Sequence, residues 1–125
     1  LAVRASVSSG TTTYTPTSEM DHLSAKPDFT LLLYPAWVGH RGTGGLSEWV
    51  HVRSDFGPTF ITAARDDQHF GSAPPYGTAL RAAGVPVEEL YFDEGGHGFS
   101  LREPEAIASW PEAALAFLKE QEFLP

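Results

Sequence analysis

The chain has 125 residues, of which 42% are hydrophobic and 19% are charged, so it is long enough for one globular domain with one core. Its formal net charge is −8, and the acidic residues are spread along the sequence. This charge argues against nucleic acid and anionic membranes as partners, because phosphate binding needs clustered Lys and Arg. The absence of cysteine excludes disulfides, thiolate metal sites and a cysteine nucleophile.

The N-terminal part carries few structural signals. Residues 1–6 predict the end of a helix that Gly10 terminates. Residues 11–28 are rich in Thr, Ser and Pro and predict a loop, with one short turn at residues 19–23. The start lacks the basic residues and the apolar middle of a signal peptide, and no apolar run approaches the roughly 20 residues of a membrane span. The sequence does not determine the cellular compartment of the protein.

Three short apolar runs predict strands. Residues 29–34 and 58–64 are continuous and non-alternating, as in strands that are buried on both faces of a parallel sheet. Residues 87–92 alternate in part, which indicates a strand nearer the edge of the sheet. Between the first two, the glycine-rich residues 36–56 have no period and predict an irregular excursion of the kind that often forms a binding loop.

Helical spacing appears twice, once on each side of the third strand. Residues 72–83 carry small and apolar side chains at helical intervals and end at Gly84. Residues 109–121 carry an apolar stripe behind a Ser, Pro and Glu start signal. Strands alternating with helices predict an α/β fold with a parallel sheet and helices on its faces. The first strand would then have an open edge, which we expect another segment or chain to cover.

Two segments that follow predicted strands are rich in titratable side chains. Residues 65–69 (Arg-Asp-Asp-Gln-His) follow the second strand, and residues 93–99 (Asp-Glu-Gly-Gly-His-Gly-Phe) follow the third. Ligands of open parallel sheets bind beyond the carboxyl ends of the strands, so an aspartate of the first segment and His97 are expected to meet at one rim. A histidine held at Nδ1 by a carboxylate keeps Nε2 free to accept a proton from a hydroxyl.

Each feature alone has a simpler explanation. An Asp-Asp pair after a strand is commonly a turn or a helix cap. A histidine in a glycine-rich loop is commonly just exposed, and His69 is interpreted in this way as loop surface. The two features together, in the order acid and then histidine behind buried strands, favour a catalytic pair.

Several motifs in order resemble the C-terminal half of α/β hydrolases of the acetyl-esterase and xylan-esterase-like kind, over about residues 20 to 120. The strongest are Gly-Gly-His-Gly-Phe at residues 95–99 and Leu-Arg-Ala-Ala-Gly-Val-Pro at residues 80–86. The others are Pro-Asp-Phe-Thr-Leu-Leu-Leu-Tyr-Pro at residues 27–35, Pro-Thr-Phe at 58–60, Asp66-Asp67, and Trp110-Pro111. The acid also precedes the histidine, as in these enzymes, whose nucleophile comes first.

The resemblance implies a partial α/β-hydrolase domain over residues 1–125, carrying the last three strands and the helices that follow them. It implies Asp66 as the triad acid, with Asp67 as the alternative, and His97 as the general base. Residues 36–56 would overhang the site, which makes Trp37 and Trp49 candidate substrate-binding residues, although packing is the simpler explanation for each. No metal or organic cofactor is implied.

The nucleophile of this family is missing from the sequence. Gly-x-Ser-x-Gly occurs nowhere in the 125 residues, and neither does the His-Gly-rich oxyanion segment. The family places both upstream, so the chain, which starts with Leu and not Met, is expected to begin inside the helix after the nucleophile elbow. Loss of a triad nucleophile costs about a millionfold in turnover, so the isolated chain is predicted to be inactive. A companion chain or a missing N-terminal half is expected to supply the serine and to cover the open sheet edge.

The predicted function is therefore hydrolysis of a carboxylic ester by the complete enzyme, with a small-molecule or carbohydrate ester, such as an acetyl ester, as substrate. A serine peptidase of the prolyl-oligopeptidase kind remains an alternative, because it shares the acid pair and the later histidine. A non-catalytic assembly module derived from a hydrolase is a second alternative. A metal site is a third, but its spacing matches no known metal motif; its ligands would be Asp66, Asp67, His69 and His97.

Overall fold

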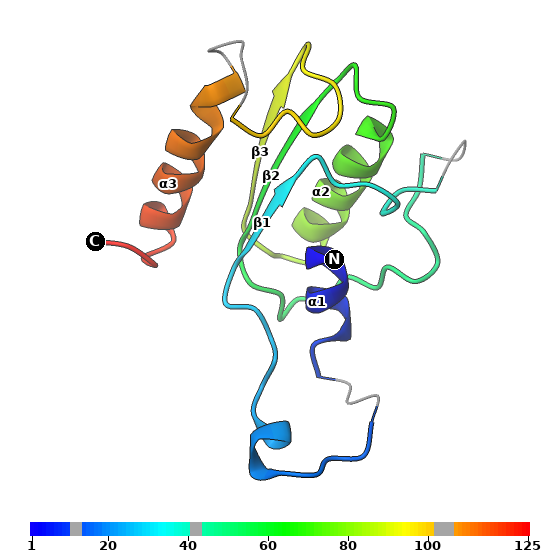
Figure 1. Cartoon of the computed structure of the whole chain (residues 1–125), viewed down its shortest axis with the longest axis vertical. Coiled ribbons are helices and arrows are strands. Elements are labelled where there is room, and N and C mark those ends of the chain that lie inside the picture. The colour runs from blue at the N-terminus through cyan, green and yellow to red at the C-terminus, as the bar shows by residue number, and fades with distance from the viewer. Residues whose placement is uncertain (11–13, 41–43, 102–106) are drawn as a thin grey trace.

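The computed structural model describes residues 1–10, 14–40, 44–101 and 107–125. Its strands form one parallel sheet in the order β1–β2–β3 (Figure 1). The strands are β1 Thr30–Leu33, β2 Thr59–Ala64 and β3 Val87–Phe92. All three predicted strands and their parallel arrangement are confirmed.

Helices cover both faces of this sheet, as predicted (Figure 1). The three α-helices are α1 Ala2–Ser8, α2 Ala73–Ala82 and α3 Trp110–Glu120. Short 3₁₀ turns add η1 Glu19–His22, η2 Phe70–Ser72 and η3 Ile107–Ser109. Side chains of α1 and α2 pack into one core on one face, whereas α3 packs on the other. The sequence predicted the α-helices and the turn at η1, but not η2 or η3.

Strand β2 is the centre of the core because it pairs with β1 on one side and β3 on the other. All six of its residues are buried. Ile61 and Ala63 pack with α1 and α2, while Phe60 packs against Phe117 of α3. Burial on both faces explains why this strand reads as an unbroken apolar run. Strand β3 is only half-buried, which fits its partial alternation and its place at the sheet edge.

The described part of residues 36–56 contains no helix or strand and only an isolated antiparallel bridge between Gly39 and Leu46. The predicted irregular excursion is confirmed for these positions, and residues 41–43 lie outside the described residues, as do residues 11–13 of the predicted N-terminal loop. No helix in the described ranges has the length and apolarity to cross a lipid bilayer.

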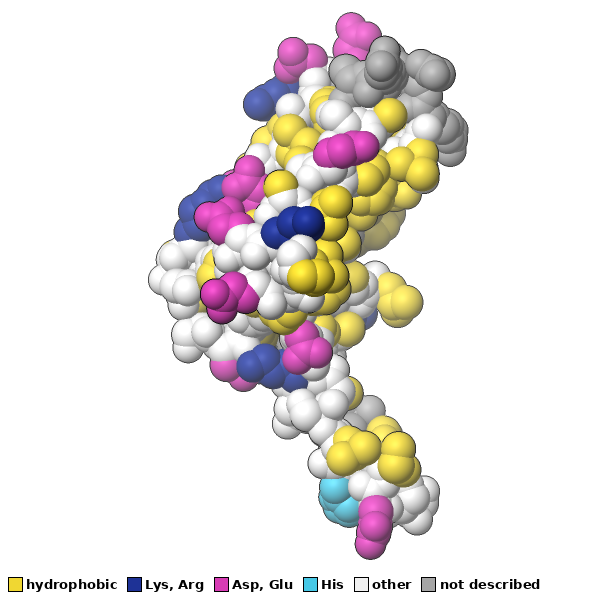
Figure 2. Space-filling model, turned by 90° about the vertical axis from the view of Figure 1, so that its left-hand side faces the viewer, with side chains coloured by type: hydrophobic (Ala, Val, Ile, Leu, Met, Phe, Trp, Pro, Cys, Tyr) yellow, Lys and Arg dark blue, Asp and Glu magenta, His cyan; other side chains and the backbone are white. Residues whose placement is uncertain are grey.

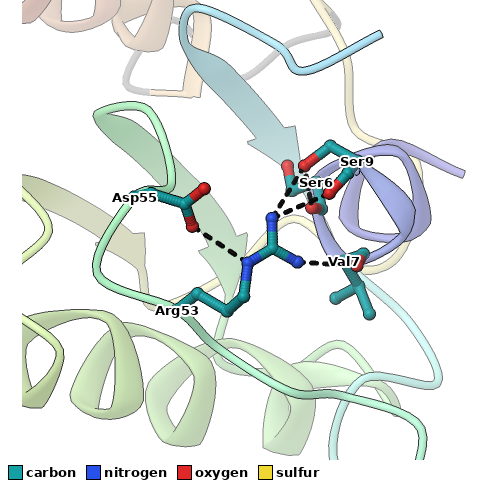
Figure 3. A network of polar contacts seen from close by, with 5 residues as sticks. All are labelled: Ser6, Val7, Ser9, Arg53 and Asp55. Carbon is teal, nitrogen blue, oxygen red and sulfur yellow. Dashed lines mark hydrogen bonds and ion pairs between the residues drawn. The ribbon is translucent and has the colours of Figure 1, made fainter. Parts of the chain in front are cut away.

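Arg53 ties this excursion to the end of α1 (Figure 3). Its guanidinium donates hydrogen bonds to the backbone carbonyls of Val7 and Ser9, at 3.1 and 2.8 Å, and to the Ser9 hydroxyl at 3.1 Å. Asp55 accepts a further bond from Nε at 2.9 Å. The carbonyls at a helix C-terminus lack partners within the helix, so Arg53 satisfies groups that α1 cannot satisfy itself.

Residues 14–27 form an arm that projects from the body, at the bottom of Figure 1 and at the lower end of the surface in Figure 2. Its side chains are almost all exposed, including the apolar Met20 and Leu23, which are 71% and 64% exposed. Asp21 organises the arm by accepting hydrogen bonds from the Tyr14 hydroxyl at 2.8 Å and from the backbone N–H groups of Thr17 and Ser18 at 2.9 Å each. The arm is therefore shaped from within and not by the core.

Candidate active site

The turn after β2 directs two neighbouring aspartates in different directions. The backbone N–H of Arg65 still bonds to Phe92 of β3, at 2.8 Å, so the sheet pairing extends one residue beyond β2. The chain then turns back, because the N–H of Asp67 bonds to the carbonyl of Ala64 at 3.1 Å. As a result Asp66 remains exposed, whereas the side chain of Asp67 is only 1% exposed.

The loop after β3 reaches this turn through backbone conformations that favour glycine. Gly95, Gly96 and Gly98 have φ values of 148°, 63° and 78°. The φ of Gly95 disfavours any side chain, and a Cβ there would also lie 2.6 Å from Cδ1, the movable end of the Ile107 side chain, so the position favours glycine chiefly for its conformation. These glycines allow the loop after β3 to bring His97 to Asp67, which lies just beyond the carboxyl end of β2.

His97 and Asp67 form the central contact of the site. Nδ1 of His97 lies 2.8 Å from Oδ2 of Asp67. The other carboxylate oxygen, Oδ1, accepts the backbone N–H of His69 at 2.8 Å. In the tautomer with the hydrogen on Nδ1, the imidazole donates to this carboxylate and Nε2 is the nitrogen left to accept a proton. The His97 side chain is 41% exposed, so the pair joins a buried acid to an accessible imidazole.

Asp66 does not contact the imidazole. Its Oδ1 accepts the backbone N–H of Gly96 at 2.8 Å, and its Oδ2 accepts that of Gly95 at 3.2 Å. The N–H of Gly96 is the main cause that holds the pKa of Asp66 below its usual value; burial opposes it, and the N–H of Gly95 adds a smaller lowering effect. The structure therefore corrects the preference for Asp66 as the partner of His97: the turn geometry gives that place to Asp67, the alternative.

Aromatic rings surround the imidazole. The ring of Tyr34 lies 5.2 Å from that of His97, edge to face, and also packs on Phe99. His69, interpreted from the sequence as loop surface, is half-buried, and its ring is 5.0 Å from that of His97. Tyr34 stands at the end of β1 with a φ of 42°, and strained backbone of this kind gathers at functional sites. Tyr34 was not identified as a site residue from the sequence; the signal that could have indicated it is its position at the end of a predicted strand, just before Pro35.

The two candidate substrate-binding tryptophans have different surroundings. Trp37 is 61% exposed, has a φ of 65°, and lies 5.0 Å from the ring of His69. It lines a cavity of about 450 Å³ together with His69, Gln68 and His40. Trp49 is half-buried, packs against the main core, and has the guanidinium of Arg4 4.3 Å from its ring centre. The structure thus brings Trp37 next to His69, which in turn contacts His97, whereas Trp49 packs against the core.

A second cavity, of about 750 Å³, lies along the open edge of β1 and reaches His97. It is lined by the start of α1, by β1 and by the segment that follows it, and it includes Trp37 and Trp49. No three His, Asp or Glu side chains within the described ranges gather closely enough to hold a metal ion. The site combines a buried acid, a histidine and the adjoining cavity of about 750 Å³.

No family model matches the chain, and no curated protein gives a significant match. Solved structures that share its fold include two hydrolases. The first is an acetyl ester-xyloside bifunctional hydrolase from Caldicellulosiruptor lactoaceticus, with a TM-score of 0.83 and 19% identity over 99% of this chain and 53% of that one. The second is esterase 2 of Thermogutta terrifontis, phosphoramylated by tabun, with a TM-score of 0.75 and 22% identity over 96% of this chain and 51% of that one.

The chain thus spans about half the length of the solved structures that it matches. At these identities the likeness concerns the fold, and it confirms the prediction of a partial α/β-hydrolase fold with parallel strands and helices on both faces. The resemblance to esterases inferred from the sequence motifs is also confirmed at the level of the fold.

Proposed function

We propose that this chain supplies the acid and the base of a serine-type carboxylic-ester hydrolase, with Asp67 as the acid and His97 as the base. The observation that carries the proposal is the 2.8 Å contact between His97 Nδ1 and the buried Asp67 carboxylate. A base of this kind needs one tautomer and one orientation, and both follow from an acceptor at Nδ1. The shared fold with two hydrolases supports the same reaction class.

In the proposed mechanism Nε2 of His97 removes the proton from a serine hydroxyl as the oxygen attacks the ester carbonyl. The imidazolium that forms is stabilised by Asp67 and then gives the proton to the leaving alcohol. A water molecule then attacks the acyl-serine ester, with His97 again acting as base and then as acid, and this frees the serine and releases the carboxylic acid product. Asp67 does not rotate during these steps, because its second oxygen is held by the backbone N–H of His69. No step needs a metal or an organic cofactor.

The serine would come from an upstream half or a companion chain that covers the open edge of β1. The groove of about 750 Å³ along this edge leads to His97, so a strand docked there could present a nucleophile to Nε2. In this proposal the same half and residues 1–125 together form one domain. Without it, the isolated chain is expected to hydrolyse esters no faster than buffer.

Trp37 is proposed to contact the substrate. Its exposed indole borders the cavity of about 450 Å³ beside His69, within reach of the imidazole cluster. A flat apolar ring beside polar groups suits the faces and hydroxyls of a sugar, which supports a carbohydrate ester as the substrate class. We propose the same role for Trp49, which packs against the core but also lines the cavity of about 750 Å³ that reaches His97.

The test compares p-nitrophenyl acetate hydrolysis by the complete protein, with the serine-bearing half present, before and after His97→Ala. We expect the variant to lose about a millionfold in kcat, which brings it near the uncatalysed rate. His22→Ala, on the projecting arm, is the matched control and should keep full activity. Undiminished hydrolysis in His97→Ala would refute the proposal, and cleavage of a peptide in preference to the ester would redirect it to peptidases.

A further inference from the structure

The loop that carries His97 cannot hold its shape through ordinary backbone preferences. Gly95, Gly96 and Gly98 lie in the left-handed region, and so does Ser100, with a φ of 51°. A run with so many positive φ values gains much conformational freedom on loosening, so it needs ties from outside itself to stay ordered. Two carboxylates of the neighbouring turn supply such ties.

The two ties act on different parts of the loop. Asp67 contacts the imidazole of His97, and Asp66 contacts the backbone just before it, at the N–H groups of Gly95 and Gly96. One carboxylate that spans two successive N–H groups fixes both the position and the direction of that backbone. Bonds of this kind to a charged acceptor are about twice as strong as neutral ones.

We infer that Asp66 is a positioning residue, whose carboxylate clamps the backbone ahead of His97 and thereby keeps the imidazole within reach of Asp67. The clamp itself is a property of this loop, whereas its effect on turnover rests on the function proposed above. The lowered pKa of Asp66 agrees with a carboxylate that binds these N–H groups in its charged form.

The loop offers a matched control in Asp93. This residue is also an exposed aspartate, lies in the same loop as His97, and forms an ion pair with Arg65 at 3.3 Å. The N–H groups of Gly95 and Gly96 donate their hydrogen bonds to Asp66 and not to Asp93. Removing either carboxylate changes the local charge equally, so only a clamp predicts that the two variants differ at these glycines.

The experiment measures amide hydrogen exchange and chemical shifts by NMR in the ¹⁵N-labelled chain. In Asp66→Ala we expect the amides of Gly95 and Gly96 to shift and to exchange about tenfold to a hundredfold faster, the range expected for losing a charge-assisted bond. Signals of the His97 ring should broaden or move. Asp93→Ala should leave all of them unchanged.

Asp66→Asn guards against a variant that fails to fold, because its amide oxygen can still accept one of the two bonds. It should give changes smaller than those of Asp66→Ala at the same two glycines. Amides of β2 report whether the core remains folded in each variant. Unchanged exchange and shifts at Gly95 and Gly96 in both Asp66 variants would overturn the clamp.

A second readout separates the clamp from the proposed function. In the complete enzyme Asp66→Ala should lower kcat by up to about a hundredfold with little change in KM, as expected when a catalytic group is misplaced by about an ångström. If the glycine amides respond while kcat stays unchanged, Asp66 orders the loop but does not position the base, and the inference fails in that respect. If no ester is hydrolysed at all, the amides still decide whether the clamp exists.

Discussion

Two regions of this molecule are organised by aspartates, and they differ in the reach of the contacts. In the projecting arm, Asp21 accepts from Tyr14, Thr17 and Ser18, all within seven positions. At the rim of the sheet, Asp66 and Asp67 contact residues 29 to 30 positions away. The first arrangement shapes a segment, whereas the second joins the ends of two strands into a site.

Burial separates Asp67 from the arm, whereas Asp66 is exposed as the arm residues are. The side chain of Asp67 is almost completely buried at the end of β2, while the arm exposes nearly every residue. Local hydrogen bonds between a short polar side chain and nearby backbone can form without tertiary packing. Long-range bonds exist only after the sheet has formed. The comparison therefore predicts large functional effects at the rim and small, local effects in the arm.

The largest expected difference is in turnover. In the complete enzyme, Asp67→Asn should lower kcat by about ten-thousandfold, because the histidine loses the acceptor that fixes its tautomer and stabilises its charge. Asp21→Asn removes one negative charge in the same way, but it lies in the arm and should leave kcat unchanged. Steady-state hydrolysis of p-nitrophenyl acetate measures both, and a comparable loss in the two variants would break the distinction between the regions.

The next difference is in the free energy of unfolding. Phe60→Ala should destabilise the chain by about 3–5 kcal/mol, because Phe60 is fully buried in β2 and packs on α3. Met20→Ala, at the exposed tip of the arm, should change it by no more than about 0.5 kcal/mol. Urea unfolding followed by circular dichroism measures both. A large effect of Met20→Ala would mean that the arm packs on something in solution.

The smallest effect concerns the response of the arm to acid. The backbone N–H of Thr17, followed by the Tyr14 hydroxyl and the N–H of Ser18, lowers the pKa of Asp21 to about 2. Because the pKa of Asp21 is lowered in the folded chain, the stabilisation from its hydrogen bonds in the arm is fully present above about pH 4 and is lost as the pH falls toward 2.

Amide shifts of Thr17 and Ser18 should follow this acid transition, and Asp21→Asn should abolish it without disturbing amides of β2. Titration of the two amides near pH 4 instead would show that Asp21 is not the acceptor.

The parts of the fold that depend on apolar runs and on glycine residues were predictable from the sequence. The unbroken apolar residues of β2 identified a central strand, because only a strand covered on both faces can be apolar throughout. The glycines around His97 indicated a loop with unusual backbone, and its place after β3 put the histidine at the carboxyl rim. These features depend on short stretches of sequence.

Which of Asp66 and Asp67 contacts the imidazole of His97 was not predictable from the sequence. Both are short acids in one turn, and the direction of each side chain depends on the hydrogen bond from Asp67 N–H to Ala64, which no residue pattern specifies. His69 was likewise assigned to the surface, although it lies two positions beyond Asp67, where its N–H can bond to that carboxylate. The placement of Tyr34 and Trp37 around the imidazole required the three-dimensional fold.

The contact of Arg53 with α1 has a consequence for how the molecule loosens. A helix of seven residues does not persist alone in water, and here its last carbonyls rely on a side chain that arrives from beyond β1. The two segments should therefore share one opening event, although 44 positions separate Ser9 from Arg53. Protease cleavage near Arg53 would then expose α1 at the same time, leaving the strands and the histidine loop as the more persistent unit.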